Sequence, residues 1–186
     1  MKQEALRERL LLELDLLTAD VMAVADGLSD AQLRWAPPTG GWSIGQVLEH
    51  VIVAADSYLA RMRALIYRPG APLTLAAQHD WEPTLTGSLL VGTLKSQRKW
   101  PAPKIWRVGP EPRANVTRES LTRQQAVLTL LRAAADLDWD RIRFRSPANR
   151  LIRLNLGDGF TVLVVHGQRH ALQMERVRGL PGFGKR

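Results

Sequence analysis

The 186-residue sequence contains no cysteine and only four histidines. The absence of cysteine excludes disulfide bonds, thiolate metal sites and a cysteine nucleophile, which leaves histidine and carboxylate as the plausible metal ligands. No apolar run approaches the roughly 18 residues that a membrane-spanning helix needs. The N-terminal residues lead into a charged helical pattern and not into an apolar signal core. We therefore expect a cytoplasmic protein that has no membrane partner.

Acidic residues are in the minority: 18 aspartates and glutamates face 26 lysines and arginines, which gives a net charge of +8. Most of the basic residues are scattered arginines. The densest cluster lies in an expected loop and consists of Arg141, Arg143, Arg145, Arg150 and Arg153, with Phe144 among them. A phosphate-binding surface and a solvated basic loop both fit this cluster, and the solvated loop is the simpler interpretation. The sequence has no helix-turn-helix motif and no basic stripe along one helix, so nucleic-acid binding is disfavoured.

Four segments have the apolar spacing of amphipathic helices. Capping-box patterns mark two of the starts, with Ser43 followed by Gln46 and Thr122 followed by Gln125. The predicted helices cover residues 2–27, 43–67 and 122–140, and a fourth begins at Asp158 or Thr161 and ends near Arg178.

The connection from 68 to 120 contains seven prolines, which forbid long helices across much of it. Only a short helix within 86–100 is expected there, and residues 141–155 are expected to form a second loop. The sequence shows no convincing strand. The pattern predicts a single all-α domain over 1–186, a four-helix bundle with a long crossover between helices two and three. Residues 178–186 are expected to form a flexible tail.

The fourth predicted helix carries His166 and His170, whose spacing places both imidazoles on one face, one turn apart. Val162, Gln173 and Val177 share that face, so polar groups occupy the centre of a stripe that should face the core. Buried polar groups need partners, and a metal can satisfy both imidazoles together. Such a pair alone is weak evidence for a metal, because surface pairs are common.

A third histidine, His50, falls on the flank of the apolar stripe of the second helix, a position suited to reach a cleft between helices. His79 lies in the crossover and is most simply a solvated loop histidine. The H-E-x-x-H signature of zinc proteases is absent, because Gly167 follows His166. Gly40 and Gly41 lack the lysine and the spacing of a phosphate-binding loop.

Three segments together are similar to the DinB/YfiT-like superfamily. They are residues 41–50 (GWSIGQVLEH), 101–106 (PAPKIW) and 166–173 (HGQRHALQ). The resemblance implies a four-helix bundle with up-down-down-up connectivity and a divalent metal, nickel or zinc, held by His50, His166 and His170. Gly167 departs from the better helix former expected between the two ligand positions, which puts the local helix geometry in doubt.

The resemblance also implies a chemistry. Enzymes of this superfamily include thiol-dependent S-transferases and a thiol-dependent isomerase, so we expect a low-molecular-weight thiol that attacks a small electrophile. No residue stands out as a general base, and Arg169 is a candidate for holding a carboxylate of the thiol or substrate. Alternatives are a non-catalytic metal-binding or stress-related bundle and, less favoured, a nucleic-acid-binding protein. The oligomeric state is left open: bundles of this superfamily often pair as dimers, and for a homodimer Trp100, Ile105 and Trp106 are the candidate interface residues.

Overall fold

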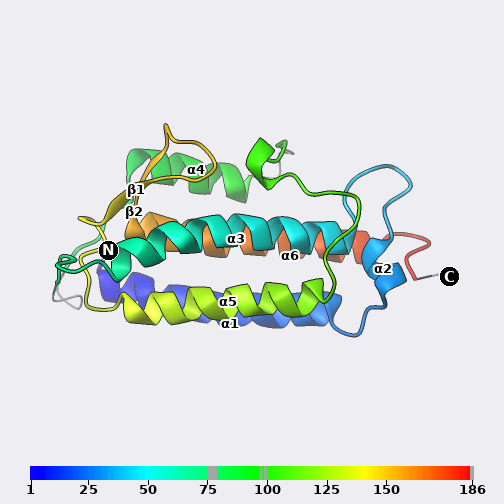
Figure 1. Cartoon of the computed structure of the whole chain (residues 1–186), viewed down its shortest axis with the longest axis horizontal. Helices are drawn as coiled ribbons and strands as arrows, with labels where there is room; N and C mark the ends of the chain where they lie inside the picture. The colour runs from blue at the N-terminus through cyan, green and yellow to red at the C-terminus, as the bar shows by residue number, and fades with distance from the viewer. Residues whose placement is uncertain (75–78, 97, 99, 185–186) are drawn as a thin grey trace.

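The computed structural model describes residues 1–74, 79–96, 98 and 100–184. Four long helices form a bundle (Figure 1): α1 (Gln3–Ala25), α3 (Ile44–Ile66), α5 (Val116–Ala133) and α6 (Leu156–Arg178). Both α1 and α3 pack against α5 and α6, so every long helix has two long neighbours. Each buries an apolar stripe of the predicted kind, such as Leu10, Leu14, Leu17 and Val21 on α1. The predicted four-helix bundle is confirmed.

The contacts at one end of the bundle define the helix directions. Leu73 pairs with Leu137 just beyond the ends of α3 and α5. The side chain of Gln3, at the start of α1, donates to the Leu137 carbonyl at 2.9 Å, and the Leu156 amide at the start of α6 donates to the Trp139 carbonyl at 3.0 Å. Thus α1 and α6 begin where α3 and α5 finish, as the colours in Figure 1 also show.

The connection from α3 to α5 contains two short elements, α4 (Leu85–Lys95) and the 3-10 helix η1 (Lys104–Trp106). A buried carboxylate fixes α4 on α6: Asp158 accepts from the Thr84 hydroxyl at 2.7 Å and from the Thr84 amide at 3.2 Å. At the closest approach, a Cβ added to Gly87 would lie 2.3 Å from the Asp158 carboxyl carbon. The expected short helix is therefore present, although residues 97 and 99 of its predicted range lie outside the described part of the chain.

The bounds predicted for the third long helix, residues 122–140, were wrong for α5. The capping box at Ser43 and Gln46 is present, but α5 begins at Val116, upstream of Thr122. Its N-cap is Asn115, which has a positive φ of 54° and makes no side-chain capping bond. The Thr122 hydroxyl instead donates to the Arg118 carbonyl at 2.9 Å, one turn back inside the helix. The first turns of α5 lack the expected apolar spacing, and burial of Val116 still holds them against the bundle.

The predicted loop over 141–155 was also wrong in part. Two short antiparallel strands form there, β1 (Arg143–Arg145) and β2 (Arg153–Asn155). Two arginines of the basic cluster bond to nearby carbonyls in this hairpin: Arg143 donates to Asp140 at 3.0 Å and Arg145 to Arg150 at 2.7 Å. The hairpin lies close to α4 and to the start of α6.

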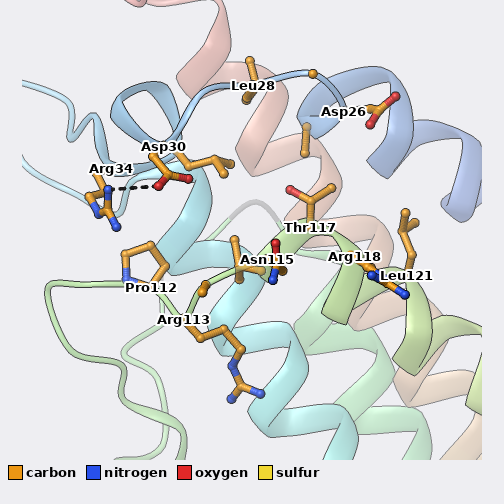
Figure 2. Close-up of a pocket in the computed structure, with 15 residues that line it drawn as sticks. Asp26, Leu28, Asp30, Arg34, Pro112, Arg113, Asn115, Thr117, Arg118 and Leu121 are labelled. Carbon is orange, nitrogen blue, oxygen red and sulfur yellow. Dashed lines mark ion pairs between the residues drawn. The ribbon is translucent and has the colours of Figure 1, made fainter.

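Large aromatic side chains fill part of the core between the helices. Trp139, Tyr58 and Phe160 are among the largest fully buried side chains of the core. The end that holds α2 (Asp30–Arg34) has a cavity of about 410 Å³ between the end of α1 and the start of α5 (Figure 2).

Phe183, within the predicted tail, packs edge-on against Trp35 with ring centroids 5.5 Å apart. Residues 185–186 of that tail lie outside the described part of the chain. Within the described ranges, none of the helices is long and apolar enough to cross a membrane.

Candidate metal centre

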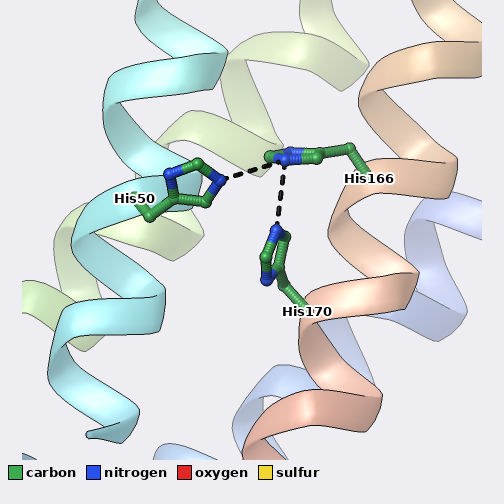
Figure 3. Close-up of side chains that lie close together, drawn as sticks. All are labelled: His50, His166 and His170. Carbon is green, nitrogen blue, oxygen red and sulfur yellow. Dashed lines mark hydrogen bonds between the residues drawn. The ribbon is translucent and has the colours of Figure 1, made fainter. Parts of the chain in front are cut away.

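Two helices bring the three predicted ligands together (Figure 3). His166 and His170 project from successive turns of α6, and His50 projects toward them from α3. The Nε2 atom of His166 lies 3.2 Å from Nε2 of His50 and 3.1 Å from Nε2 of His170. One ring nitrogen from each histidine lies within 4.8 Å of the other two. The structure thus gathers residues that are far apart in the sequence into one constellation.

Burial keeps these imidazoles uncharged. His50 is 3% exposed and His170 is 7% exposed, whereas His166 is half-buried. Loss of hydration lowers the pKa of His50, lowers that of His166 well below its usual value and lowers that of His170 to about 3. The neighbouring imidazoles push the pKa values of His166 and His170 in the same direction. At neutral pH all three are therefore neutral, which is the form that ligates a metal.

The outer ring nitrogens have partners that orient two of the rings. His50 Nδ1 donates to the main-chain carbonyl of Trp106 at 2.9 Å, and His170 Nδ1 faces Oε1 of Gln173 at 2.9 Å. Because both oxygens can only accept, the Nδ1 atoms carry the protons and the Nε2 lone pairs point inward. Metal-ligating histidines commonly have such a second partner, which fixes the tautomer and the ring orientation.

The donor set fits a divalent cation. Because the Nε2 atoms of His50 and His170 both carry lone pairs, only His166 Nε2 can supply a hydrogen, and one hydrogen can bridge only one of the two short contacts. A cation between the rings would accept the lone pairs of all three nitrogens. Metal–nitrogen bonds of about 2.0–2.1 Å place two ligand nitrogens about 3.0 Å apart at a right angle and about 3.4 Å apart at a tetrahedral angle. The observed separations of 3.1 and 3.2 Å fall between these values.

Two tryptophans pack around the histidines. The Trp42 ring lies 4.9 Å from His50, and the Trp106 ring lies 6.3 Å from His50 and 6.1 Å from His166, measured between centroids. Trp106 is only 6% exposed and its indole N–H donates to Ser57 at 3.0 Å. It is therefore unavailable to a partner chain, contrary to the sequence-based expectation, whereas Trp100 and Ile105 are exposed.

Arg169 does not occupy the role suggested for it. Its guanidinium donates to the main-chain carbonyls of Leu94, Ser96 and Arg98, at the end of α4 and just beyond it. It thereby ties the crossover to α6 beside the histidines instead of pointing at a substrate. Gly167 is helical and faces α1, where an added Cβ would lie 2.5 Å from Cδ2 of Leu17.

His79 is not the solvated loop residue that was expected. Its Nε2 lies 3.1 Å from Asp140 Oδ2 and 3.4 Å from Asp138 Oδ1. The sequence does not reveal the role of the Trp106 carbonyl, because a main-chain acceptor leaves no trace in a side-chain pattern. Gln173, which shares the helix face of His166 and His170, bonds to His170.

Comparison with known proteins places the chain in a family. No curated protein matches the sequence. Among solved structures, the chain is similar to YfiT from Bacillus subtilis, described as a probable metal-dependent hydrolase with an unusual four-helix bundle topology. The two are 15% identical, with a TM-score of 0.56 over 92% of this chain and 85% of YfiT, which supports the shared fold. The sequence model of the DinB superfamily matches residues 13–174, from the middle of α1 almost to the end of α6. This match spans all three histidines, and the chain belongs to the DinB superfamily.

Proposed function

We propose that the protein is a metal-dependent enzyme that holds one divalent cation, nickel or zinc, between His50, His166 and His170. The observation that carries the proposal is the inward convergence of three neutral imidazole nitrogens from two helices. Three neutral ligands leave the full charge of a divalent cation uncompensated and at least one coordination position open. When bound, such a cation supplies Lewis acidity that lowers the pKa of a water or thiol in the open position.

The protein residues have separate parts in this proposal. The three histidines bind the cation, while the Trp106 carbonyl and Gln173 hold two of the rings in the ligating tautomer. Trp42 and Trp106 pack against His50 and limit its contact with water, which strengthens electrostatic interactions at the site. Arg169 ties the end of α4 to α6 within one turn of His166 and His170.

We propose that the nucleophile is a low-molecular-weight thiol and that the second substrate is a small electrophile. The contacts described for the three histidines involve aromatic rings, an amide, a main-chain carbonyl and one another, with no carboxylate among them. The nearest acidic residue in the sequence, Glu49, is engaged by Arg113 at 2.7 Å. A thiol needs less help than water to lose its proton, since its unperturbed pKa is about 8.5 and that of water about 15.7. The sulfur would then form the new bond to the electrophilic carbon, while that carbon gives up its bond to a leaving group or the electron pair of a π bond. The thiol proton would pass to solvent, and the leaving group or the carbanion formed from the π bond would take up a proton from solvent.

Hydrolysis is the second candidate. It is favoured by the fold shared with YfiT, which is described as a probable metal-dependent hydrolase. In that case water replaces the thiol as the nucleophile at the same histidines. A thiol-dependent isomerisation uses the same site and differs only in that the thiol is regenerated.

The first experiment measures bound metal, and so tests the site separately from the reaction. Purified protein should contain about one equivalent of nickel or zinc, and the His166→Ala/His170→Ala variant should contain none at this site. Glu175→Ala, an exposed position on the same helix, is the matched control and should keep the metal. Equal metal in the histidine variant and the control, after correction for any other site, would refute the proposed centre.

The second experiment identifies the reaction. Bacillithiol, mycothiol and glutathione are each assayed with a panel of electrophiles, and an ester and amide panel is assayed without thiol. We expect thiol consumption that depends on the metal and on His166. Turnover of the hydrolysis panel alone would favour the second candidate, and a protein that binds metal but turns over neither panel would be a non-catalytic bundle.

A further inference from the structure

We propose that a second divalent-cation site lies at the end of the bundle where α1 and α6 begin, formed by His79, Asp138 and Asp140. The ligand atoms come from two segments far apart in the sequence, the crossover before α4 and the turn before β1. One nitrogen or oxygen from each residue lies within 4.8 Å of the other two. This site does not depend on the function proposed above.

The proton count at His79 argues for a cation. Its Nε2 faces two carboxylate oxygens, Asp140 Oδ2 at 3.1 Å and Asp138 Oδ1 at 3.4 Å. Nε2 carries at most one hydrogen, which can be directed well at only one of these oxygens. The oxygen of the other carboxylate would then lie close to His79 Nε2 with no hydrogen between the two atoms. A cation among the three atoms attracts both carboxylates and the lone pair of a neutral imidazole at the same time.

Both carboxylates are held in place by other bonds. Asp140 Oδ1 accepts from the Asn155 amide group at 3.0 Å. Asp138 Oδ1 accepts from the main-chain amides of Asp140 and Arg141, both at 3.1 Å, and the residue is only 6% exposed. Ligands oriented in this way lose little freedom when a cation binds.

The surroundings of the cluster leave room for water. A cavity of about 330 Å³ adjoins Asp140 and is lined also by Glu82 and Arg143, and by Asp80, whose carboxylate already pairs with Lys2 at 3.1 Å. Arg143 donates to the main-chain carbonyl of Asp140, and Arg141, whose side chain is 77% exposed, lies 3.5 Å from Asp138. A carboxylate-rich donor set with access for water suits a hard divalent ion such as Mn²⁺.

A cation here would join three parts of the chain. The His79 carbonyl accepts from the Gln3 amide at 3.0 Å, and the Gln3 side chain bonds to the Leu137 carbonyl and to the Trp139 amide. The start of α1, the crossover and the turn after α5 therefore meet beside the proposed ligands. We infer that the site is structural and that it stabilises this end of the bundle.

The test uses Mn²⁺ and a protein that lacks the histidine centre. In the His166→Ala/His170→Ala background, titration with Mn²⁺ followed by electron paramagnetic resonance should show one bound equivalent, with a rise in melting temperature. Adding Asp140→Asn, which keeps an oxygen to accept from Asn155, should weaken Mn²⁺ binding by at least about tenfold. His79→Gln is a second variant with the same expectation, and circular dichroism checks that both remain folded. The matched control is Asp80→Asn, an exposed position in the same segment, which should bind Mn²⁺ as the background does.

Two results would overturn the proposal. If the background protein binds no Mn²⁺, His79 and the aspartates form only an ion pair. If both Asp140→Asn and His79→Gln bind Mn²⁺ as tightly as the background, the ion lies elsewhere. Neither result bears on the histidine centre, because the background lacks two of its ligands.

Discussion

The low pKa of His170 predicts that the metal-free protein is sensitive to mild acid. His170 has a pKa of about 3 in the folded protein, against 6.5 for an unperturbed histidine. Between these values the unfolded chain binds a proton at this residue and the folded chain does not, so the free energy of unfolding falls as the pH falls. The stability is fully present above pH 6.5 and is lost progressively below it.

The size of the effect follows from the two pKa values. At about pH 5.5 the unfolded histidine is mostly protonated, which stabilises the unfolded state by about 1.4 kcal/mol, while at about pH 7.5 the same effect is about 0.1 kcal/mol. His170→Gln should therefore reduce the pH dependence of the unfolding free energy by about 1.3 kcal/mol over this interval. The pKa values of His50 and His166 are shifted in the same direction, so the wild-type protein should lose more than this amount in total.

The assay is urea unfolding at the two pH values with a chelator present, because a bound metal would add its own proton competition. Leu172→Ala, an exposed and non-titrating change close by on α6, should keep the full pH dependence of the wild-type protein. If His170→Gln and the wild-type protein lose equal stability on acidification, His170 is not held neutral by burial, and the argument for a preformed ligand fails.

Three further predictions concern the packing of α4 on α6 and the surroundings of the histidine centre. Gly87→Ala places a methyl group against the buried Asp158 carboxylate and should lower the unfolding free energy by about 1–3 kcal/mol. Gly92→Ala, on the same helix, adds a methyl group where no atom lies within 4 Å and should raise the unfolding free energy by up to about 1 kcal/mol. Urea unfolding of the two variants measures both effects. Arg169→Met removes the hydrogen bonds to the carbonyls at and beyond the end of α4 and should lower the unfolding free energy by about 1–3 kcal/mol in the same assay. The metal content should stay unchanged, and a loss of metal would instead make Arg169 part of the site. Gln173→Leu should weaken zinc binding by about 10–100-fold in a competition titration, because His170 loses the partner of its outer nitrogen; unchanged affinity would show that this bond does not orient the ring.

The sequence predicts the bundle well because its four long helices each bury a regular apolar stripe. It predicts the start of α5 poorly, since Thr122 and Gln125 match a capping pattern in the middle of a helix. The helix extends to Asn115 through contacts that only the folded bundle supplies, including the burial of Val116. The β-hairpin is missed because its strands are only three residues long and rich in arginine, without the alternation that marks a half-buried strand.

The sequence pattern likewise predicts some of the site's contacts and misses others. His166 and His170 are placed together by helix geometry alone, and the stripe of the second helix puts His50 near the same cleft. The bond from His50 to the Trp106 carbonyl depends on how the crossover folds over α3, and no side-chain pattern encodes it. The contact of His79 with Asp140 joins residues that are 61 positions apart through a connection rich in proline, so periodicity cannot predict it.

The two clusters offer different ligands, and this difference can be used to separate them experimentally. Three neutral imidazoles, two of them buried and one half-buried, favour nickel, copper or zinc, whereas one imidazole and two carboxylates beside a water-accessible cavity suit manganese. The histidine centre lies between α3 and α6, and the His79 cluster lies where α1, the crossover and the turn after α5 meet. Zinc at the first site should therefore govern reactivity, and manganese at the second should govern the stability of the bundle end. If one ion restored both properties to the metal-free protein while only one equivalent was bound, the assignment of separate roles to the two clusters would be wrong.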